Sequence, residues 1–217
     1  MRKMVLSLVL LGLLFLSPLA NANGKLDFGG KLDDGDLFLL TSLDYSWPAE
    51  SEHLERDIKF NYRYQDKSDR TTTNKGLLQF KQRYEFAKKH YVFGLGRYDY
   101  NEFRSIHTRF QASAGWGYKI LRTDKIKMSN ELAIGMLHTN EGDEVIYRNS
   151  LWFFYNLAEK LTFSNKYLYE GSNIPLTRME SELSYQLLDN TKIGIKNIYT
   201  EDPISDNIIS FNVGYTW

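Results

Sequence analysis

The sequence has 217 residues, of which 42% are hydrophobic, 15% aromatic and 25% charged, and its formal net charge is zero. It contains no cysteine, which excludes disulfides, thiol catalysis and zinc–thiolate sites. Its 27 basic and 27 acidic residues leave no basic excess that would recruit nucleic acid.

The N-terminus has the pattern of a secretory signal peptide. Arg2 and Lys3 precede an apolar stretch from Met4 to Leu16, and Ala20-Asn21-Ala22 is an A-x-A cleavage site. We therefore expect residues 1–22 to be removed and residues 23–217 to form one domain, with about two negative charges in excess. Beyond Ala22 no apolar run is long enough for a membrane helix, so the mature chain could span a membrane only as a closed β-barrel.

From Gly24 onward, apolar and polar residues alternate in segments of about ten to fourteen residues separated by turn signals. The mean hydropathy of −0.44 suits a barrel with an apolar outside and a polar inside. We expect about twelve strands: Lys25–Lys31, Asp36–Trp47, Leu54–Tyr64, Gly76–Ala87, Tyr91–Tyr100, Ile106–Tyr118, Lys125–Leu137, Glu144–Tyr155, Leu161–Glu170, Thr177–Leu188, Lys192–Thr200 and Asn207–Trp217.

Three local features qualify this pattern. The polar stretch from Gln65 to Asn74 predicts a loop. The aromatic residues of the fifth strand change parity by Tyr98, which predicts a bulge or a strand end near Arg97. Gly115 and Gly117 lie in the sixth strand, where they would make room for a bulky neighbour such as Trp152 or ease curvature.

The C-terminal segment is a strongly alternating strand that ends on an aromatic residue. Aromatic residues also gather at the ends of most other strands, as in the two girdles of a membrane barrel. The segment resembles the C-terminal insertion signal of outer-membrane barrels at Ser210, Tyr215 and Trp217, although Asn212 occupies the usual glycine position.

The polar face of the strands predicts a charged interior. Twelve tilted strands give a barrel radius of roughly 12 Å, so long side chains would nearly fill the lumen or leave a narrow channel. We expect opposite charges on neighbouring strands to hold this lumen, with Lys81, Arg83, Glu85, Arg109 and Glu131 as its centre. The interior candidates are Lys81, Arg83, Glu85, His107, Arg109, Glu131, Arg148, Glu180, Glu182 and Lys196, with Lys59, Lys127 and Lys166 also on this face.

Enzymatic alternatives have weaker signals. His107, with Ser105 two residues before it, is the one histidine expected on the polar face of a strand, but a barrel hydrolase would need a serine where Arg109 lies. Glu180 and Glu182 share a strand face and more often pair with Lys or Arg than act as acid and base. No metal-ligand spacing is present, so we expect neither a cofactor nor a catalytic residue.

Residues 91–139 carry a family resemblance. Within them an R-Y-D-Y block, a phenylalanine, an arginine, a G-x-G-Y motif and then an acidic residue and a glycine in the next strand resemble the YdiY-like family of salt-induced outer-membrane proteins. The resemblance departs at the N-terminal end, where the first strand looks abbreviated. It implies an outer-membrane barrel and no established activity.

Together these patterns predict an all-β, transmembrane, antiparallel up-and-down barrel in the outer membrane of a Gram-negative bacterium. Its function would be structural, or that of a narrow pore for small solutes or ions. Two alternatives stay open: an outer-membrane hydrolase acting on lipid or peptide, and a periplasmic lipid-binding β-protein. We expect a monomer whose partners are outer-membrane lipid, lipopolysaccharide and the barrel-assembly machinery.

Overall fold

The computed structural model describes the backbone of residues 23–33, 36–48, 53–67, 70–102, 107–173, 175–189, 191–202 and 204–216. Within these ranges it describes the side chains of residues 41–46, 53–65, 73–102, 107–173, 175–189, 191–201 and 209. The expected signal peptide, residues 1–22, and Trp217 lie outside the described residues, as do the side chains of Ser210 and Tyr215.

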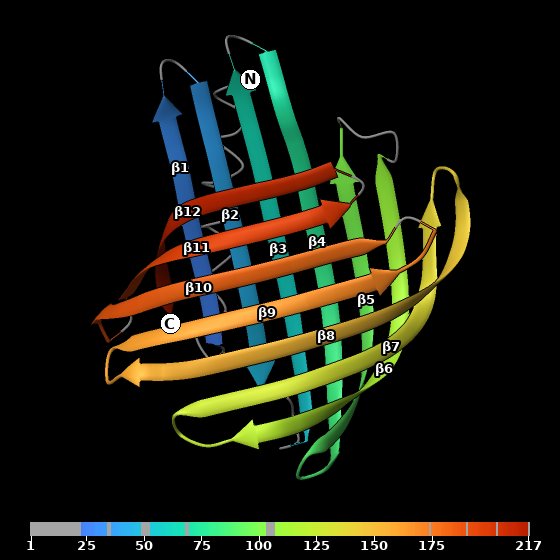
Figure 1. The fold of residues 1–217 in the computed structure, drawn as a ribbon, viewed down its shortest axis with the longest axis vertical. Helices are drawn as coiled ribbons and strands as arrows, with labels where there is room; N and C mark the ends of the chain where they lie inside the picture. The colour runs from blue at the N-terminus through green and yellow to red at the C-terminus, as the bar shows by residue number, and fades with distance from the viewer. Residues whose placement is uncertain are drawn as a thin grey trace.

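The described part of the chain forms twelve antiparallel strands that close into an up-and-down barrel, which confirms the predicted fold class (Figure 1). Each strand pairs with its neighbours in sequence, and β1 pairs with β12 to close the barrel. The strands are β1 Asn23–Asp33, β2 Asp36–Pro48, β3 Leu54–Lys67, β4 Arg70–Ala87, β5 His90–Asn101, β6 Thr108–Arg122, β7 Ile126–Thr139, β8 Gly142–Ala158, β9 Leu161–Gly171, β10 Leu176–Leu188, β11 Thr191–Asp202 and β12 Ile204–Thr216. No helix in these ranges is long and apolar enough to cross a membrane.

The two walls of the barrel cross each other in projection. In Figure 1 strands β1 to β5 run steeply behind strands β8 to β12, which cross them in front. Such crossing follows from the tilt that strands must adopt when a sheet closes on itself. The closing seam is short, because β1 and β12 are in register only over Lys25–Phe28 and Val213–Thr216.

Two sequence expectations about strand length are wrong. The N-terminal strand is not abbreviated, since β1 extends from Asn23 to Asp33 and is paired with β2 over that whole length. The predicted loop from Gln65 to Asn74 is mostly strand, because β3 reaches Lys67 and β4 begins at Arg70. Backbone pairing continues there across polar residues, which the alternation of apolar residues cannot reveal.

Irregular pairing is concentrated beside the turns at one end of the barrel. Four register shifts lie at Glu85/Ala87, Lys119/Leu121, Asn156/Ala158 and Gln186/Leu188, each just before the turn that follows its strand, and a fifth lies at Gln65/Asp66, at the other end of the barrel. No shift occurs at Arg97, where pairing with β4 and β6 is continuous, so the predicted bulge or strand end at this position is wrong.

The outside of the barrel is apolar. Phe80, Leu132 and Ile195 are 42%, 48% and 46% exposed, as expected for residues directed outward. Exposed aromatic rings lie near both strand ends, with Tyr84, Phe86 and Trp116 at one end and Tyr98, Tyr147 and Tyr169 at the other. An apolar band between two sets of aromatic rings is the surface that a bilayer covers.

Candidate functional site: the lumen

Strand β5 directs its large side chains into the barrel. Tyr91, Phe93 and Leu95 are buried at 2%, 4% and 4% exposure, while Val92 and Tyr98 between and beyond them are exposed. The change of parity that the sequence shows is therefore not a bulge. The apolar residues before Arg97 belong to the inner face of a continuous strand, and Arg97 follows them on that face.

Glycines on β6 make this inward packing possible. A Cβ atom at Gly117 would lie 2.1 Å from the ring of Tyr91, and one at Gly115 would lie 2.7 Å from the ring of Phe93. The bulky neighbours are thus Tyr91 and Phe93 rather than Trp152, which corrects the sequence expectation. With no side chains on β6 at these positions, the Tyr91 ring lies across β6 and reaches β7.

The carboxylate of Glu131 on β7 contacts both an aromatic side chain of β5 and a charged side chain of β4. It accepts a hydrogen bond from the Tyr91 hydroxyl at 2.8 Å and pairs with the Lys81 ammonium from β4. The Lys81 Nζ atom also lies 4.5 Å from the centre of the Phe93 ring. Lys81 lies on β4 and Glu131 on β7, so this ion pair connects two strands that are separated by β5 and β6.

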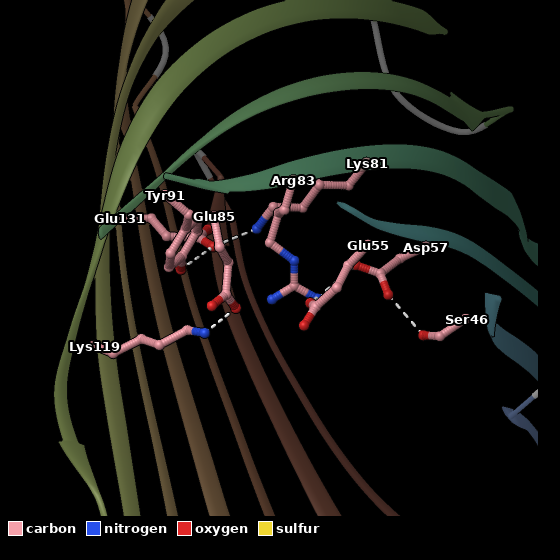
Figure 2. Close-up of polar contacts among 9 residues, drawn as sticks. All are labelled: Ser46, Glu55, Asp57, Lys81, Arg83, Glu85, Tyr91, Lys119 and Glu131. Carbon is pink, nitrogen blue, oxygen red and sulfur yellow. Dashed lines mark hydrogen bonds and ion pairs between the residues drawn. The ribbon is translucent and has the colours of Figure 1, made fainter. Parts of the chain in front are cut away.

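Further pairs continue from Lys81 along the lumen, as Figure 2 shows. Arg83 contacts Asp57 at 2.8 Å and Glu55 at 3.0 Å, and Lys119 pairs with Glu85. We call this group the paired cluster, since every cation in it has a carboxylate partner: Ser46, Glu55, Asp57, Lys81, Arg83, Glu85, Tyr91, Lys119 and Glu131.

A second charged region lies next to the paired cluster. On β4 it begins at Gln79, the inward-facing residue that precedes Lys81. It surrounds a pocket of about 380 Å³, including the part that opens to solvent. Five of its lining side chains are cationic and one is acidic. We call it the cationic pocket, defined by Lys59, Arg97, Arg148, Lys166, Arg178 and Glu180, with Leu77, Gln79 and Leu168 completing the lining.

Glu180 is the shared carboxylate of this pocket. Its Oε1 atom lies 2.8 Å from Arg178 Nε, and its Oε2 atom lies 3.4 Å from Lys196 Nζ and 3.8 Å from Lys59 Nζ. Glu180 has one formal negative charge and is shared by three cations, of which Lys59 also lies 3.9 Å from Asp44.

Two arginines of the pocket meet around Glu170. Arg97 lies 3.4 Å from this carboxylate and 2.7 Å from Asp99, and Arg148 lies 3.6 Å from it. The side chains of Arg97, Arg148 and Glu170 are 6%, 2% and 4% exposed, so this group is held in the barrel wall with little water.

The predicted interior residues distribute over both regions. Lys81, Arg83, Glu85 and Glu131 lie in the paired cluster, whereas Arg148, Glu180 and Lys196 lie in or beside the cationic pocket. Arg109 and Glu182 are partly buried on β6 and β10. The prediction for His107 is wrong, because it precedes β6 and is exposed, with its Nδ1 atom 3.4 Å from the carbonyl oxygen of Asn101.

Several residues of the site were not identified from the sequence. Tyr91 and Phe93 were not expected to carry part of the lumen, although the G-x-G on β6 marks the space they occupy. Asp57, Lys119 and Glu170 supply partners for the candidate charges, and their alternation within strands could have found them. Among the described residues, no group of three or more His, Asp and Glu side chains could hold a metal ion.

Residues 41–217 match the family model described as "Protein of unknown function, DUF481", and this is the YdiY-like family that the sequence motifs indicated. A comparison with curated proteins found no match.

Similar solved structures are outer-membrane barrels. The NanC porin aligns with a TM-score of 0.56 and 13% identity, over 89% of this chain and 97% of its own. The COG4313 outer membrane channel from Pseudomonas putida F1 aligns at 0.54 and 9%, over 90% and 94%. The KdgM porin, in complex with disordered oligogalacturonate, aligns at 0.51 and 10%, over 89% and 98%. At these identities the likeness concerns the fold.

Proposed function

This chain belongs to the DUF481 family, and from that premise we propose that it is a narrow outer-membrane channel for small charged solutes. The observation that carries this proposal is the cationic pocket. A structural barrel could fill its lumen with charges that pair with one another, as the paired cluster does, whereas this pocket gathers five cationic side chains around a space that opens to solvent. The similar folds of NanC, KdgM and the COG4313 channel support a conducting role.

The channel is narrow because large side chains of β5 point into the lumen. Tyr91, Phe93 and Leu95 are buried together and pack with Ala133 of β7, so they occupy part of the cross-section beside the ion pairs. A solute would pass between these side chains and the opposite wall. We therefore expect small ions to pass, and larger solutes to be excluded.

The test is single-channel recording of purified protein in planar lipid bilayers. We expect small, discrete conductance steps in the wild type. Phe93→Ala should increase the step size, because it removes a ring from the constriction, whereas Phe80→Ala on the outer face should leave it unchanged. A protein that inserts and gives no steps, and still gives none as Phe93→Ala, would be a structural barrel instead.

The hydrolase alternative gains no support from the described geometry. His107 is exposed and precedes β6, so it does not lie on the polar face of a strand, where a catalytic histidine of the barrel would be expected. Ser105 lies outside the described residues.

A further inference from the structure

Three polar side chains interrupt the apolar outside of the barrel on β9, β10 and β11. Asn165 is paired with Ser181 across β9 and β10, and Ser181 is paired with Asn197 across β10 and β11. They form a continuous row across three strands, and we call these three residues the polar row. The row lies on the wall of β8 to β12 that crosses in front in Figure 1.

The polar row lies within the apolar band and not at its edges. Alternate residues of a strand share a face, and the residues two positions from the row include Tyr167, Met179, Leu183 and Ile195, which are 38%, 39%, 42% and 46% exposed. On β10 these apolar side chains flank Ser181 on both sides. A bilayer that covers this face surrounds the row with hydrocarbon, which offers no hydrogen bonds, so unsatisfied polar groups there are costly.

The polar row satisfies only part of its hydrogen-bonding capacity. Asn165 Nδ2 donates a hydrogen bond to Ser181 Oγ at 2.7 Å. Asn197 Oδ1 accepts no hydrogen bond in the described part of the chain, although Asn197 lies beside Ser181 on the next strand. A side-chain amide has two N–H donors and an oxygen with two lone pairs, so the two asparagines have more donors and acceptors than this one bond uses.

Asparagine and glutamine side chains elsewhere on the apolar band differ from the row. Asn130 donates to Asn149 Oδ1 and to the carbonyl oxygen of Ser150, both at 3.3 Å, so these amides have partners within the barrel. Gln82 on β4 is exposed, and it is paired with Gly94 of β5, which offers no side chain. The polar row differs from both because it joins three strands and includes an amide oxygen without a donor among the described residues.

A second copy of this chain suits the polar row better than lipid does. Acyl chains have neither donors nor acceptors, and lipid headgroups lie at the edges of the band. The two amides and the hydroxyl of the row supply both donors and acceptors, so the row is complementary to itself. A two-fold axis beside Ser181 would place the row of one copy against that of the other, as in isologous dimers. Small polar side chains also allow the close approach and the hydrogen bonds that join membrane proteins.

Apolar surface beside the row adds to the contact. Ile209 of β12 is paired with Asn197 and is 69% exposed, the highest value among the exposed large apolar side chains of the described residues. We infer that the polar row and Ile209 form the centre of an interface between two copies of this chain, packed side by side in the membrane. This dimer differs from the monomer expected from the sequence, and it does not depend on conduction through the lumen.

Sedimentation equilibrium of the protein, folded in density-matched detergent micelles, tests this inference. We expect a reversible dimer whose population rises with the ratio of protein to detergent. Asn197→Leu should raise its dissociation constant about tenfold, because each copy loses a hydrogen bond at the interface. Gln82→Leu is the matched control, since it removes an outward carboxamide from the opposite wall, and it should leave the dissociation constant unchanged. A wild type that stays monomeric at every ratio, or equal losses in both variants, would overturn the inference.

Cross-linking identifies the face independently of affinity. The sequence contains no cysteine, so a single introduced cysteine reports only its own position. Ser181→Cys, oxidised in lipid vesicles, should give a disulfide-linked dimer, because the two copies of a residue beside a two-fold axis lie close together. Gln82→Cys should stay monomeric under the same oxidation. The same yield from both variants, or no cross-linking of Ser181→Cys, would contradict this interface.

The dimer and the channel are independent properties of the barrel. Heat-modifiable migration on gels should show both leucine variants folded, so that loss of the dimer is distinguished from loss of the barrel. Conductance by a protein that sediments only as a monomer would reject the dimer alone. A cross-linked dimer without conductance would reject the proposed channel alone.

Discussion

The paired cluster and the cationic pocket occupy neighbouring parts of the same lumen. They differ in how their cations are paired with carboxylates. In the paired cluster Lys81, Arg83 and Lys119 each have a carboxylate within contact distance. In the cationic pocket Glu170 and Glu180 are each shared by more than one cation, and Lys166 has no carboxylate within ion-pair distance among the described residues. The first arrangement stabilises the barrel. The second leaves one ammonium, that of Lys166, without a carboxylate partner among the described residues, which is a reason to look for function there.

The same substitution should have different effects in the two regions. Lys81→Met should lower the free energy of unfolding by about 3–5 kcal/mol, because it leaves the buried Glu131 carboxylate without its cation. Lys166→Met removes a charge that has no such partner and should be neutral or stabilising by about 1 kcal/mol. Urea unfolding of both variants in lipid vesicles measures the difference. Equal destabilisation would mean that the two regions do not differ in pairing.

The carboxylate side of the paired cluster can be tested in the same way. Glu131→Gln should cost about 3 kcal/mol, since the amide keeps a contact with Tyr91 but no longer neutralises Lys81. Glu55→Gln is the control, because Glu55 is half exposed and Arg83 retains Asp57, so its cost should stay below about 1 kcal/mol. An unchanged unfolding midpoint for Glu131→Gln would place this carboxylate in open water and disprove the cluster.

The packing beneath the paired cluster gives a smaller effect. Gly117→Ala should cost about 1–3 kcal/mol, because the new methyl group would overlap the Tyr91 ring and displace its hydroxyl from Glu131. Gly94→Ala on β5 is the matched control, since nothing described lies within 4 Å of a Cβ atom there. Heat-modifiable migration on gels compares the two proteins. Equal melting of both variants would show that Tyr91 does not depend on the glycine.

Much of the barrel could be predicted from the sequence, because a period of two marks each strand wherever one face is apolar and the other polar. The strand order and the outward residues Leu132 and Ile195 follow from that pattern. The extension of β3 and β4 across residues 65–74 does not, since both faces are polar there and only backbone pairing defines the strands.

The lumen was harder to predict for a different reason. The aromatic residues of β5 look like lipid contacts in isolation, and only the glycines of the next strand show that the rings turn inward. Lys81 and Glu131 are on strands that are not adjacent, so a rule about neighbouring strands cannot pair them. The pocket combines side chains from β3, β4, β5, β8, β9 and β10, a combination that depends on how the closed barrel brings its opposite walls together.

The reversal potential of the wild-type channel under a potassium chloride gradient tests the difference between the two regions most directly. The paired cluster contributes little net charge, so the Lys166 ammonium, which has no carboxylate within ion-pair distance among the described residues, should decide which ion passes. The account predicts a reversal potential displaced toward that of chloride. A value displaced toward the potassium potential, or a value of zero, would contradict it.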